Sequence, residues 1–350
     1  MICPECHRAY DDPHLRFCVD DGARLVDGPA VRISDVRPTA ELGQLVAGRY
    51  AIKGFLGEGG MARVYLAEDA KSGAPVAVKI LRREQVGNRL ARERFLREVD
   101  AAAHIDHPNV VRILDAGERA DRAPFLVLEF LAGETVADLL DREPFLREDF
   151  ALPVGRSAAS ALAAAHAAGV VHRDVKPENL FLVAGGGLKV VDFGVAKLKE
   201  GVVTAAGMAL GTVPYMAPEQ ALADPIDGRT DVYGLGITLF HMLTGRLPFD
   251  HEDDARTTAE LLYVAAPRPS ALRPGIDPRI DAVVLAAVRK RPELRYPSMA
   301  ALLADLERLL GERDGDIDPP ASATADVYEP QNPMSRTAAR FFRGLVQRDG

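Results

Sequence analysis

Cysteine is scarce in this sequence, and the few thiols lie together near its start. Cys3, Cys6 and Cys18 are the only three cysteines in 350 residues. An odd, clustered set does not form a disulfide framework, and this usage is typical of proteins kept in a reducing cytosol. We therefore expect a cytoplasmic protein.

Long hydrophobic runs are also missing. Apolar stretches such as ALLADL, residues 301–306, are interrupted by charge, well before the roughly 20 residues that a membrane helix needs. The first ten residues, MICPECHRAY, lack both the positive and the apolar region of a signal peptide. The sequence thus predicts no membrane span.

An excess of positive charge is absent too. The formal net charge is −8 at pH 7, whereas nucleic-acid-binding domains are usually basic. A local basic patch could exist within an acidic total, but no nucleic-acid partner is expected. Apolar and charged contents of 47% and 27% are ordinary for a soluble globular protein.

The composition and the hydrophobic periodicity change several times along the chain and divide it into four parts. Residues 1–25 form a Cys-rich head, and 26–47 lack periodicity and are interpreted as a linker. From Gly48 the pattern is first β-rich and, after residue 134, mainly helical, which defines a domain over 48–312. Residues 313–350 are predicted to be largely disordered, with a short basic amphipathic helix at 335–348.

A glycine-rich turn joins two β-like runs near the start of this domain. Gly57, Gly59 and Gly60 precede Val64, and glycine lets backbone amides approach a phosphate closely. Such a match alone is weak evidence. Ala62 stands where a third glycine is usual, and no helix follows, so a dinucleotide-binding fold is excluded by context.

Lys79 closes the apolar strand pattern VAVK, whose alternation directs Ala77 and Lys79 to the same side. A lysine in this place is usually a surface residue with a buried stem. Its functional interpretation is an ammonium that holds nucleotide phosphates and is directed by a carboxylate. Glu98, on the amphipathic helix that follows, is the candidate for that carboxylate.

The stretch HRDVKPENL, residues 172–180, concentrates Asp174, Lys176 and Asn179 in one loop. A predicted hairpin that turns at Gly185–Gly187 connects it to the triplet Asp192-Phe193-Gly194. A carboxylate and an amide oxygen are suitable ligands for Mg²⁺, which suggests Asn179 and Asp192 as a pair. Asp174 would then accept a proton from a substrate hydroxyl.

These motifs, with MAPE and DVYGLG, occur in the order of the protein-kinase signature set. Over about residues 50–310 the chain resembles eukaryotic-like (Hanks-type) Ser/Thr protein kinases, and GEGGMARVY is most similar to bacterial members. The resemblance implies an α+β, bilobal protein-kinase fold with a small β-rich lobe and a large α-rich lobe. It also implies transfer of the γ-phosphoryl group of ATP to Ser or Thr hydroxyls of protein substrates in cytosolic signalling.

The resemblance also assigns roles to residues. Asp174, Lys176, Lys79 and Glu98 would be catalytic, and Asn179 and Asp192 would hold Mg²⁺ or Mn²⁺. Glu219 would pair with Arg295, and Asp231 would anchor the catalytic loop. The residues expected to contact ATP are Leu56, Gly57, Glu58, Gly59, Gly60, Met61, Ala62, Val64, Ala77, Lys79, Glu129, Leu131 and Phe181.

Lys176, two residues after Asp174, and Thr212 match the Ser/Thr-specific form. Arg173 before the catalytic Asp implies control by a phosphorylated activation loop, in which Thr204 is the candidate phosphosite for autophosphorylation in trans. The alternative is that Thr204 is only an exposed loop residue without a regulatory role. A catalytically silent scaffold is the alternative function, and homodimers are common among similar kinases.

The Cys-rich head resembles a zinc ribbon. Cys3, Cys6 and Cys18 supply three thiolates, and Asp21 stands where a fourth cysteine would be, with His7, His14 and Asp20 as rivals. Zn²⁺ held by four protein ligands would be structural. The alternatives are a flexible tail with reduced thiols, or a nucleic-acid-binding module with the kinase attached.

Overall fold

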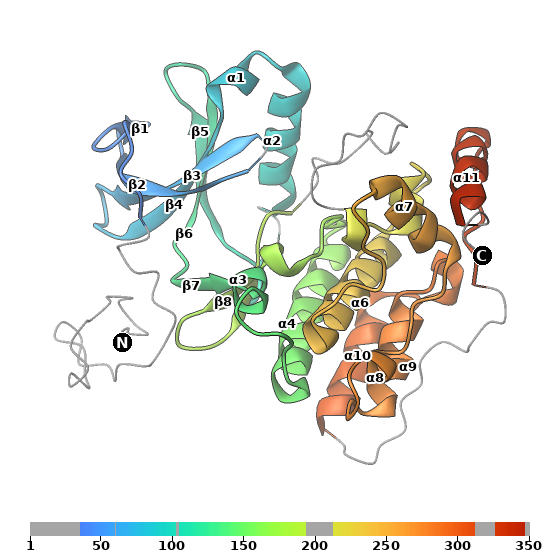
Figure 1. The fold of residues 1–350 in the computed structure, drawn as a ribbon. Helices are drawn as coiled ribbons and strands as arrows, with labels where there is room; N and C mark the ends of the chain where they lie inside the picture. Colours follow the sequence, from blue (N-terminus) through green and yellow to red (C-terminus); the bar gives the residue numbers. More distant parts are fainter. Residues whose placement is uncertain (1–35, 60, 103–104, 194–212, 312–325, 347–350) are drawn as a thin grey trace. The chain divides into compact units, whose positions relative to one another are not determined.

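The computed structural model describes residues 36–59, 61–102, 105–193, 213–311 and 326–346 (Figure 1). The chain separates into two compact units, one built from residues up to Thr135 with 181–196, and one from Val136–Leu180 with the rest. The proposed zinc ligands, Gly60 and Thr204 lie outside the described residues. No helix in the described part of the chain is long and apolar enough to cross a bilayer.

The first unit is built mainly of strands, as the sequence predicts. Its elements are β1 (Leu45–Val46), β2 (Tyr50–Glu58), β3 (Ala62–Asp69), β4 (Pro75–Leu81), α1 (Arg83–Val86), α2 (Arg89–Ala102), β5 (Ile113–Glu118), β6 (Pro124–Glu129), β7 (Gly133–Thr135), β8 (Leu180–Val183) and β9 (Leu188–Val190).

Six of these strands form one antiparallel sheet in the order β1-β2-β3-β4-β6-β5. Alternating side chains on one face, among them Tyr50, Tyr65 and Val78, are almost completely buried in one apolar cluster. On the other face Leu81 and Leu126 pack with Phe95 of α2. The sheet therefore has apolar packing on both faces, and the glycine turn lies between β2 and β3.

Part of the predicted linker belongs to this sheet. Residue 37 pairs with Phe55 through two backbone hydrogen bonds of 3.0 and 3.1 Å, and β1 pairs with β2. Val46 is 1% exposed. The prediction of a linker over 26–47 is thus wrong for residues 36–47, because these backbone groups satisfy the otherwise unpaired edge of β2.

The predicted hairpin is present as β8 and β9, which extend a small sheet in the order β7-β8-β9. Gly185, Gly186 and Gly187 have φ values of 89°, 110° and 102°. This left-handed backbone favours glycine, and the amide of Val183 donates to the carbonyl of Gly187 over 3.1 Å to close the turn.

The second unit is helical. Its elements are α3 (Val136–Leu140), α4 (Glu148–Ala167), the 3-10 turns η2 (Pro177–Asn179), η4 (Val213–Tyr215) and η5 (Pro292–Leu294), and the helices α5 (Pro218–Ala221), α6 (Gly228–Thr244), α7 (Asp254–Tyr263), α8 (Pro269–Leu272), α9 (Pro278–Ala287), α10 (Met299–Gly311) and α11 (Pro333–Val346).

Helix α6 is the centre of this unit. Almost every residue from Thr230 to Thr244 is buried, and α4, α9 and α10 pack around it (Figure 1). The Asp227 side chain accepts a hydrogen bond from the amide of Arg229 and caps its start. The mainly helical character predicted after residue 134 is confirmed here.

The segment 326–346 departs from the prediction of a largely disordered tail. It contains α11, two residues earlier than the helix expected at 335–348. Tyr328, Ala339 and Phe342 are between 1% and 4% exposed. Burial of these apolar side chains offsets the entropy of ordering the segment, which composition alone did not indicate.

Candidate active site

Lys79 and Asp192 form an ion pair in the first unit. The Lys79 Nζ lies 2.8 Å from the Asp192 Oδ1, and the two side chains are 12% and 52% exposed. Lys79 stands in the middle of β4, directly opposite Val64 of β3 and Leu126 of β6. The ammonium therefore extends from a fixed strand, while the carboxylate is open to solvent.

The backbone at Asp192 has a φ of 56°, a conformation that costs energy for a residue with a side chain. The next residue, Phe193, is 1% exposed. Such strain beside a buried anchor is common at functional sites. Glu98 lies in α2, as predicted, but its side chain is outside those that the structure describes.

The glycine turn is open where a phosphate would need access. A Cβ added at Gly57 or Gly59 would meet no atom within 4 Å. The amide of Gly59 donates to the carbonyl of Ala62 over 2.9 Å, which closes the turn. Leu56 and Glu58 belong to β2, and Met61 directly precedes β3.

Ala62 has its methyl group in the protein interior. It is 4% exposed and packs with Leu81, Leu126 and Phe95. The side chain that replaces the usual third glycine is therefore part of the apolar core beneath the turn.

Three of the residues expected to contact ATP, Val64, Ala77 and Phe181, lie on strands β3, β4 and β8 of this unit. In the antiparallel pairing of the strands, Val64 lies opposite Lys79, Ala77 opposite Leu128, and Phe181 opposite Thr135. Leu131 follows the end of β6.

The Glu129 carboxylate is held in place by two donors. It accepts the Lys189 Nζ at 2.6 Å and the amide of Arg112 at 2.8 Å. Sequence reasoning missed Lys189, because nothing local connects it to a residue 60 positions earlier.

In the second unit, Asp231 of α6 anchors the loop that carries Asp174. Its carboxylate accepts the amides of His172 at 2.8 Å and Arg173 at 2.7 Å. The Nε2 of His166 lies 2.7 Å from the same carboxylate. The predicted anchoring role of Asp231 is confirmed, and His166 is an additional partner that the motif did not reveal.

The polar side chains of the loop support one another. The Lys176 Nζ lies 3.3 Å from the Asp174 Oδ2. The Asn179 Nδ2 donates to the Asp174 carbonyl at 2.7 Å and to its carboxylate at 3.3 Å. The Asp174 carboxylate is thus oriented by an ammonium and an amide, which suits a group that must meet a substrate hydroxyl.

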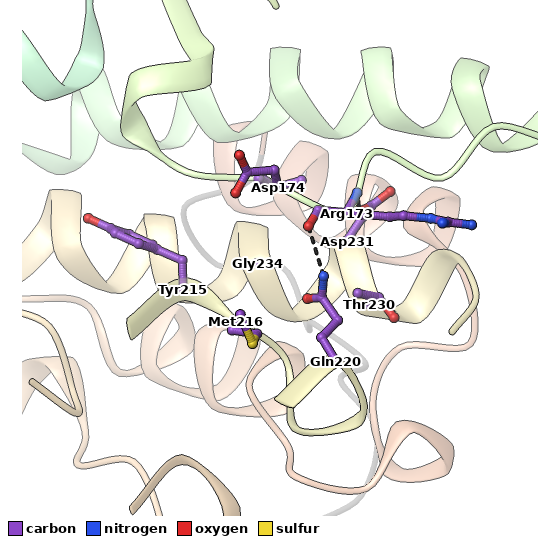
Figure 2. A pocket seen from close by; sticks show the side chains of 9 residues that line it. Arg173, Asp174, Tyr215, Met216, Gln220, Thr230, Asp231 and Gly234 are labelled. Carbon is purple, nitrogen blue, oxygen red and sulfur yellow. Dashed lines mark hydrogen bonds between the residues drawn. The ribbon is translucent and has the colours of Figure 1, made fainter. Parts of the chain in front are cut away.

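A small pocket lies beside Asp174 (Figure 2). The Gln220 Nε2 donates to the Arg173 carbonyl at 2.8 Å and ties α5 to the loop. The residues that line the pocket are Arg173, Asp174, Val175, Tyr215, Met216, Gln220, Thr230, Asp231 and Gly234.

Arg173 is unusual in two respects. Its φ is 68°, and its Nε and Nη1 are buried with no hydrogen-bond acceptor among the described residues. Burial lowers the pKa of its guanidinium, although the charge of Asp231 opposes this. Figure 2 shows the guanidinium pointing away from the Asp174 carboxylate. Burial of a cation is costly unless it is paired and hydrogen-bonded.

A buried ion pair fixes Glu219 of α5. Arg295 donates to both carboxylate oxygens of Glu219 at 2.7 and 2.8 Å, and the side chains are 0% and 2% exposed. This confirms the pair predicted from the sequence. Tyr215, next to Asp174 in the pocket, has its hydroxyl 2.7 Å from the Nδ1 of His241.

Asn179 in the second unit and Asp192 in the first unit each carry an oxygen that is chemically suitable as a Mg²⁺ ligand. The bonds that Asn179 donates through its Nδ2 leave its Oδ1 as the atom for a cation, and Asp192 supplies a carboxylate that is half-exposed. Among the described residues no group of three or more His, Cys, Asp or Glu could hold a metal by itself. One carboxylate and one amide suit a cation that keeps waters and binds substrate phosphates.

Comparison with known proteins identifies the architecture. Residues 50–302 match the model of the protein kinase domain. The chain belongs to the protein kinase family.

Among the curated relatives, the Ser/Thr-protein kinase pkn3 of Myxococcus xanthus is 35% identical over 283 residues. PrkC of Bacillus subtilis and PknB of Mycobacterium tuberculosis are both 38% identical, over 269 and 267 residues. These matches cover 75–78% of this chain but only 41–52% of the relatives. The chain thus spans about half of their length.

Solved structures agree with this assignment. The crystal structure of the Mycobacterium tuberculosis PknI kinase domain is 28% identical and superposes with a TM-score of 0.62. The similarity covers 79% of this chain and all of that domain. The kinase fold accounts for the two units and for the order of the motifs along them.

Proposed function

We propose that the protein is an ATP-dependent Ser/Thr protein kinase that modifies other proteins and itself. The observation that carries this proposal is the loop anchored by Asp231, in which Lys176 and Asn179 orient the Asp174 carboxylate. A silent scaffold would not need an Asp174 carboxylate that is oriented toward a substrate hydroxyl, because this orientation serves transfer of a phosphoryl group.

The proposed reaction follows from these side chains. Asp174 accepts the proton of a Ser or Thr hydroxyl, whose oxygen bonds to the γ-phosphorus while the bond to the ADP oxygen breaks. Lys176 balances the charge of the transferring group, and Lys79 binds the α- and β-phosphates. Asn179 and Asp192 would hold Mg²⁺, or Mn²⁺ in its place, which neutralises phosphate oxygens when bound.

Transfer of labelled phosphate from ATP tests the proposal. The wild type should label itself and a generic basic protein on Ser or Thr. Lys79→Met and Asp192→Asn should abolish labelling. Lys53→Met should retain it, because Lys53 on β2 forms only an exposed ion pair with Glu68 on β3. A folded wild type that binds ATP without transferring phosphate would favour the scaffold.

We also propose that a phosphate on the activation loop pairs with Arg173, with Thr204 as its acceptor. The buried Nε and Nη1 of Arg173 support the need for an anion, and a phosphothreonine carries about two negative charges and three acceptor oxygens. Thr204→Ala and Arg173→Gln should both lower activity. Undiminished activity of Thr204→Ala would contradict this assignment.

Transfer between two copies would be the route of autophosphorylation. Wild type should then label the Lys79→Met variant, which cannot label itself. Failure to do so, with normal labelling of an external protein, would restrict the reaction to one chain.

The sequence supports two further proposals. Cys3, Cys6, Cys18 and Asp21 would hold one structural Zn²⁺, and an ATP-using enzyme with reduced thiols would act in the cytosol. Metal analysis of the purified protein should find one zinc per chain, lost in Cys18→Ser. Absence of zinc in the wild type would favour a flexible head.

A further inference from the structure

Residues 326–346, called here the strap, run along the second unit and end in α11. Figure 1 shows α11 beside α7, and the two helices are in contact. The buried side chains of Tyr328, Ala339 and Phe342 belong to one apolar cluster with Leu261 and Leu262 of α7. The strap is therefore part of the core of this unit.

Asp224, just after α5, fixes the start of the strap. This carboxylate is 5% exposed. It accepts the Tyr328 hydroxyl at 2.9 Å, the amide of Gln331 at 3.0 Å, and the side-chain amide of Asn332. A buried carboxylate is costly unless it is fully hydrogen-bonded, so the three donors of the strap and Asp224 depend on each other.

Asn332 couples this attachment to the helix. Its Nδ2 bonds Asp224, and its Oδ1 accepts the amide of Ser335 at 2.9 Å, which caps the first turn of α11. Further along α11, the Tyr263 hydroxyl donates to the Ala339 carbonyl at 2.8 Å. Formation of the helix and its docking on α7 thus occur together.

The cluster under the strap extends to the segment beside the catalytic loop. It includes Val213, which is 0% exposed, and Met216 packs against it. Met216 and Tyr215 also line the pocket that contains Asp174 (Figure 2). The strap and the pocket are therefore connected through four consecutive residues, 213–216.

We propose that the strap is a positioning element for the protein substrate, which holds residues 213–216 in the conformation that accepts a peptide next to Asp174. This inference rests on the proposed kinase function. None of the residues lining this pocket comes from the strap. The strap therefore acts on residues 213–216 through the apolar cluster and does not occupy the pocket. Loss of its packing should weaken binding of the peptide and leave binding of ATP intact.

Two adjacent aromatic residues of α11 give a matched test in the full chain. Phe342 is 3% exposed and Phe341 is 53% exposed. Phe342→Ala should raise the KM for a basic Ser/Thr peptide by roughly fivefold to thirtyfold, with the KM for ATP and the slow hydrolysis of ATP by water unchanged. Phe341→Ala should change none of these values.

A second variant and a second measurement distinguish loss of the strap contacts from misfolding of the protein. Tyr328→Phe removes only the hydroxyl bonded to Asp224 and should raise the peptide KM in the same direction. In both Tyr328→Phe and Phe342→Ala, hydrogen exchange at residues 213–222 should become faster than in the wild type.

Three results would overturn the proposal. An unchanged peptide KM would remove the support role, a lower peptide KM would make the strap inhibitory, and a parallel loss of ATP hydrolysis would make it a general stabiliser. A wild type that phosphorylates no peptide would contradict the kinase function instead. The exchange measurement would then still test whether the strap orders residues 213–216.

Discussion

Lys79 and Asp192, 113 positions apart in the chain, meet with their charged atoms 2.8 Å apart. In the proposed reaction each of these groups has another role, the ammonium toward phosphate and the carboxylate toward Mg²⁺. ATP and the metal would then compete with an existing ion pair. The pair keeps both side chains near their working positions before nucleotide arrives.

This competition makes a prediction for Asp192→Asn. Removal of the carboxylate takes away one anionic group that competes with phosphate for the Lys79 ammonium, so metal-free ATP should bind the variant at least as tightly as the wild type. The additional affinity that Mg²⁺ gives the wild type should disappear. Titration calorimetry with ATP in EDTA and in Mg²⁺ measures both; weaker binding in EDTA would contradict the competition.

A second prediction concerns the buried pair of Glu219 and Arg295. Arg295 also donates to the carbonyls of Arg289, Arg229 and Lys290 at 2.7 to 2.9 Å. Arg295→Met leaves the Glu219 carboxylate buried without its cation and should lower the free energy of unfolding by about 3–5 kcal/mol. Urea denaturation measures this loss.

Arg147 gives the control for this prediction. It pairs with Asp149, but the two side chains are 81% and 67% exposed, and exposed pairs contribute little. Arg147→Met should leave the urea midpoint where it is. Equal effects of the two substitutions would show that burial of the Glu219 pair does not determine its contribution.

The third prediction concerns Asp231. Asparagine has the same shape but one acceptor oxygen, so Asp231→Asn leaves one of the amides of His172 and Arg173 without a partner. We expect kcat to fall about 100-fold through displacement of Asp174, with the KM for ATP unchanged. Asp141→Asn, at an exposed carboxylate of the same unit, should behave as wild type, and a loss of ATP affinity in Asp231→Asn would contradict a local effect.

The fourth prediction separates packing from phosphate binding at Ala62. Because its methyl group is buried, Ala62→Gly should lower the free energy of unfolding by about 1–2 kcal/mol and leave activity unchanged. Ala116→Gly, in an exposed position of β5, should show only the backbone part of this loss. A large gain in activity for Ala62→Gly would mean that the methyl obstructs the phosphates.

The sequence predicted those features that depend on motifs or local pattern. Gly185–Gly187 indicated the hairpin, and the resemblance to kinases indicated the roles of Asp231 and Arg295. It did not predict residues 36–47 on the sheet edge, the support of Glu129 by Lys189, or the docking of 326–346. These depend on partners that are distant in sequence, which a local pattern does not reveal.

The last prediction is a pH dependence that originates at His241. Burial lowers the pKa of His241 below its usual 6.5, so the folded protein takes up this proton less readily than the unfolded chain. Its contribution to stability is therefore complete above pH 6.5 and is lost as the pH falls below that value. A proton on Nδ1 would also disturb Tyr215, which lines the pocket beside Asp174.

His241→Asn tests this directly, because the amide can bond Tyr215 but does not titrate. The free energy of unfolding should fall more steeply between pH 7.5 and 5.5 in the wild type than in the variant, and the peptide KM should rise more steeply over the same range. Carboxylates that titrate near the lower end of this pH range are present in both proteins, so their contributions cancel in the comparison. Parallel curves for the two proteins would assign the acid sensitivity to other groups.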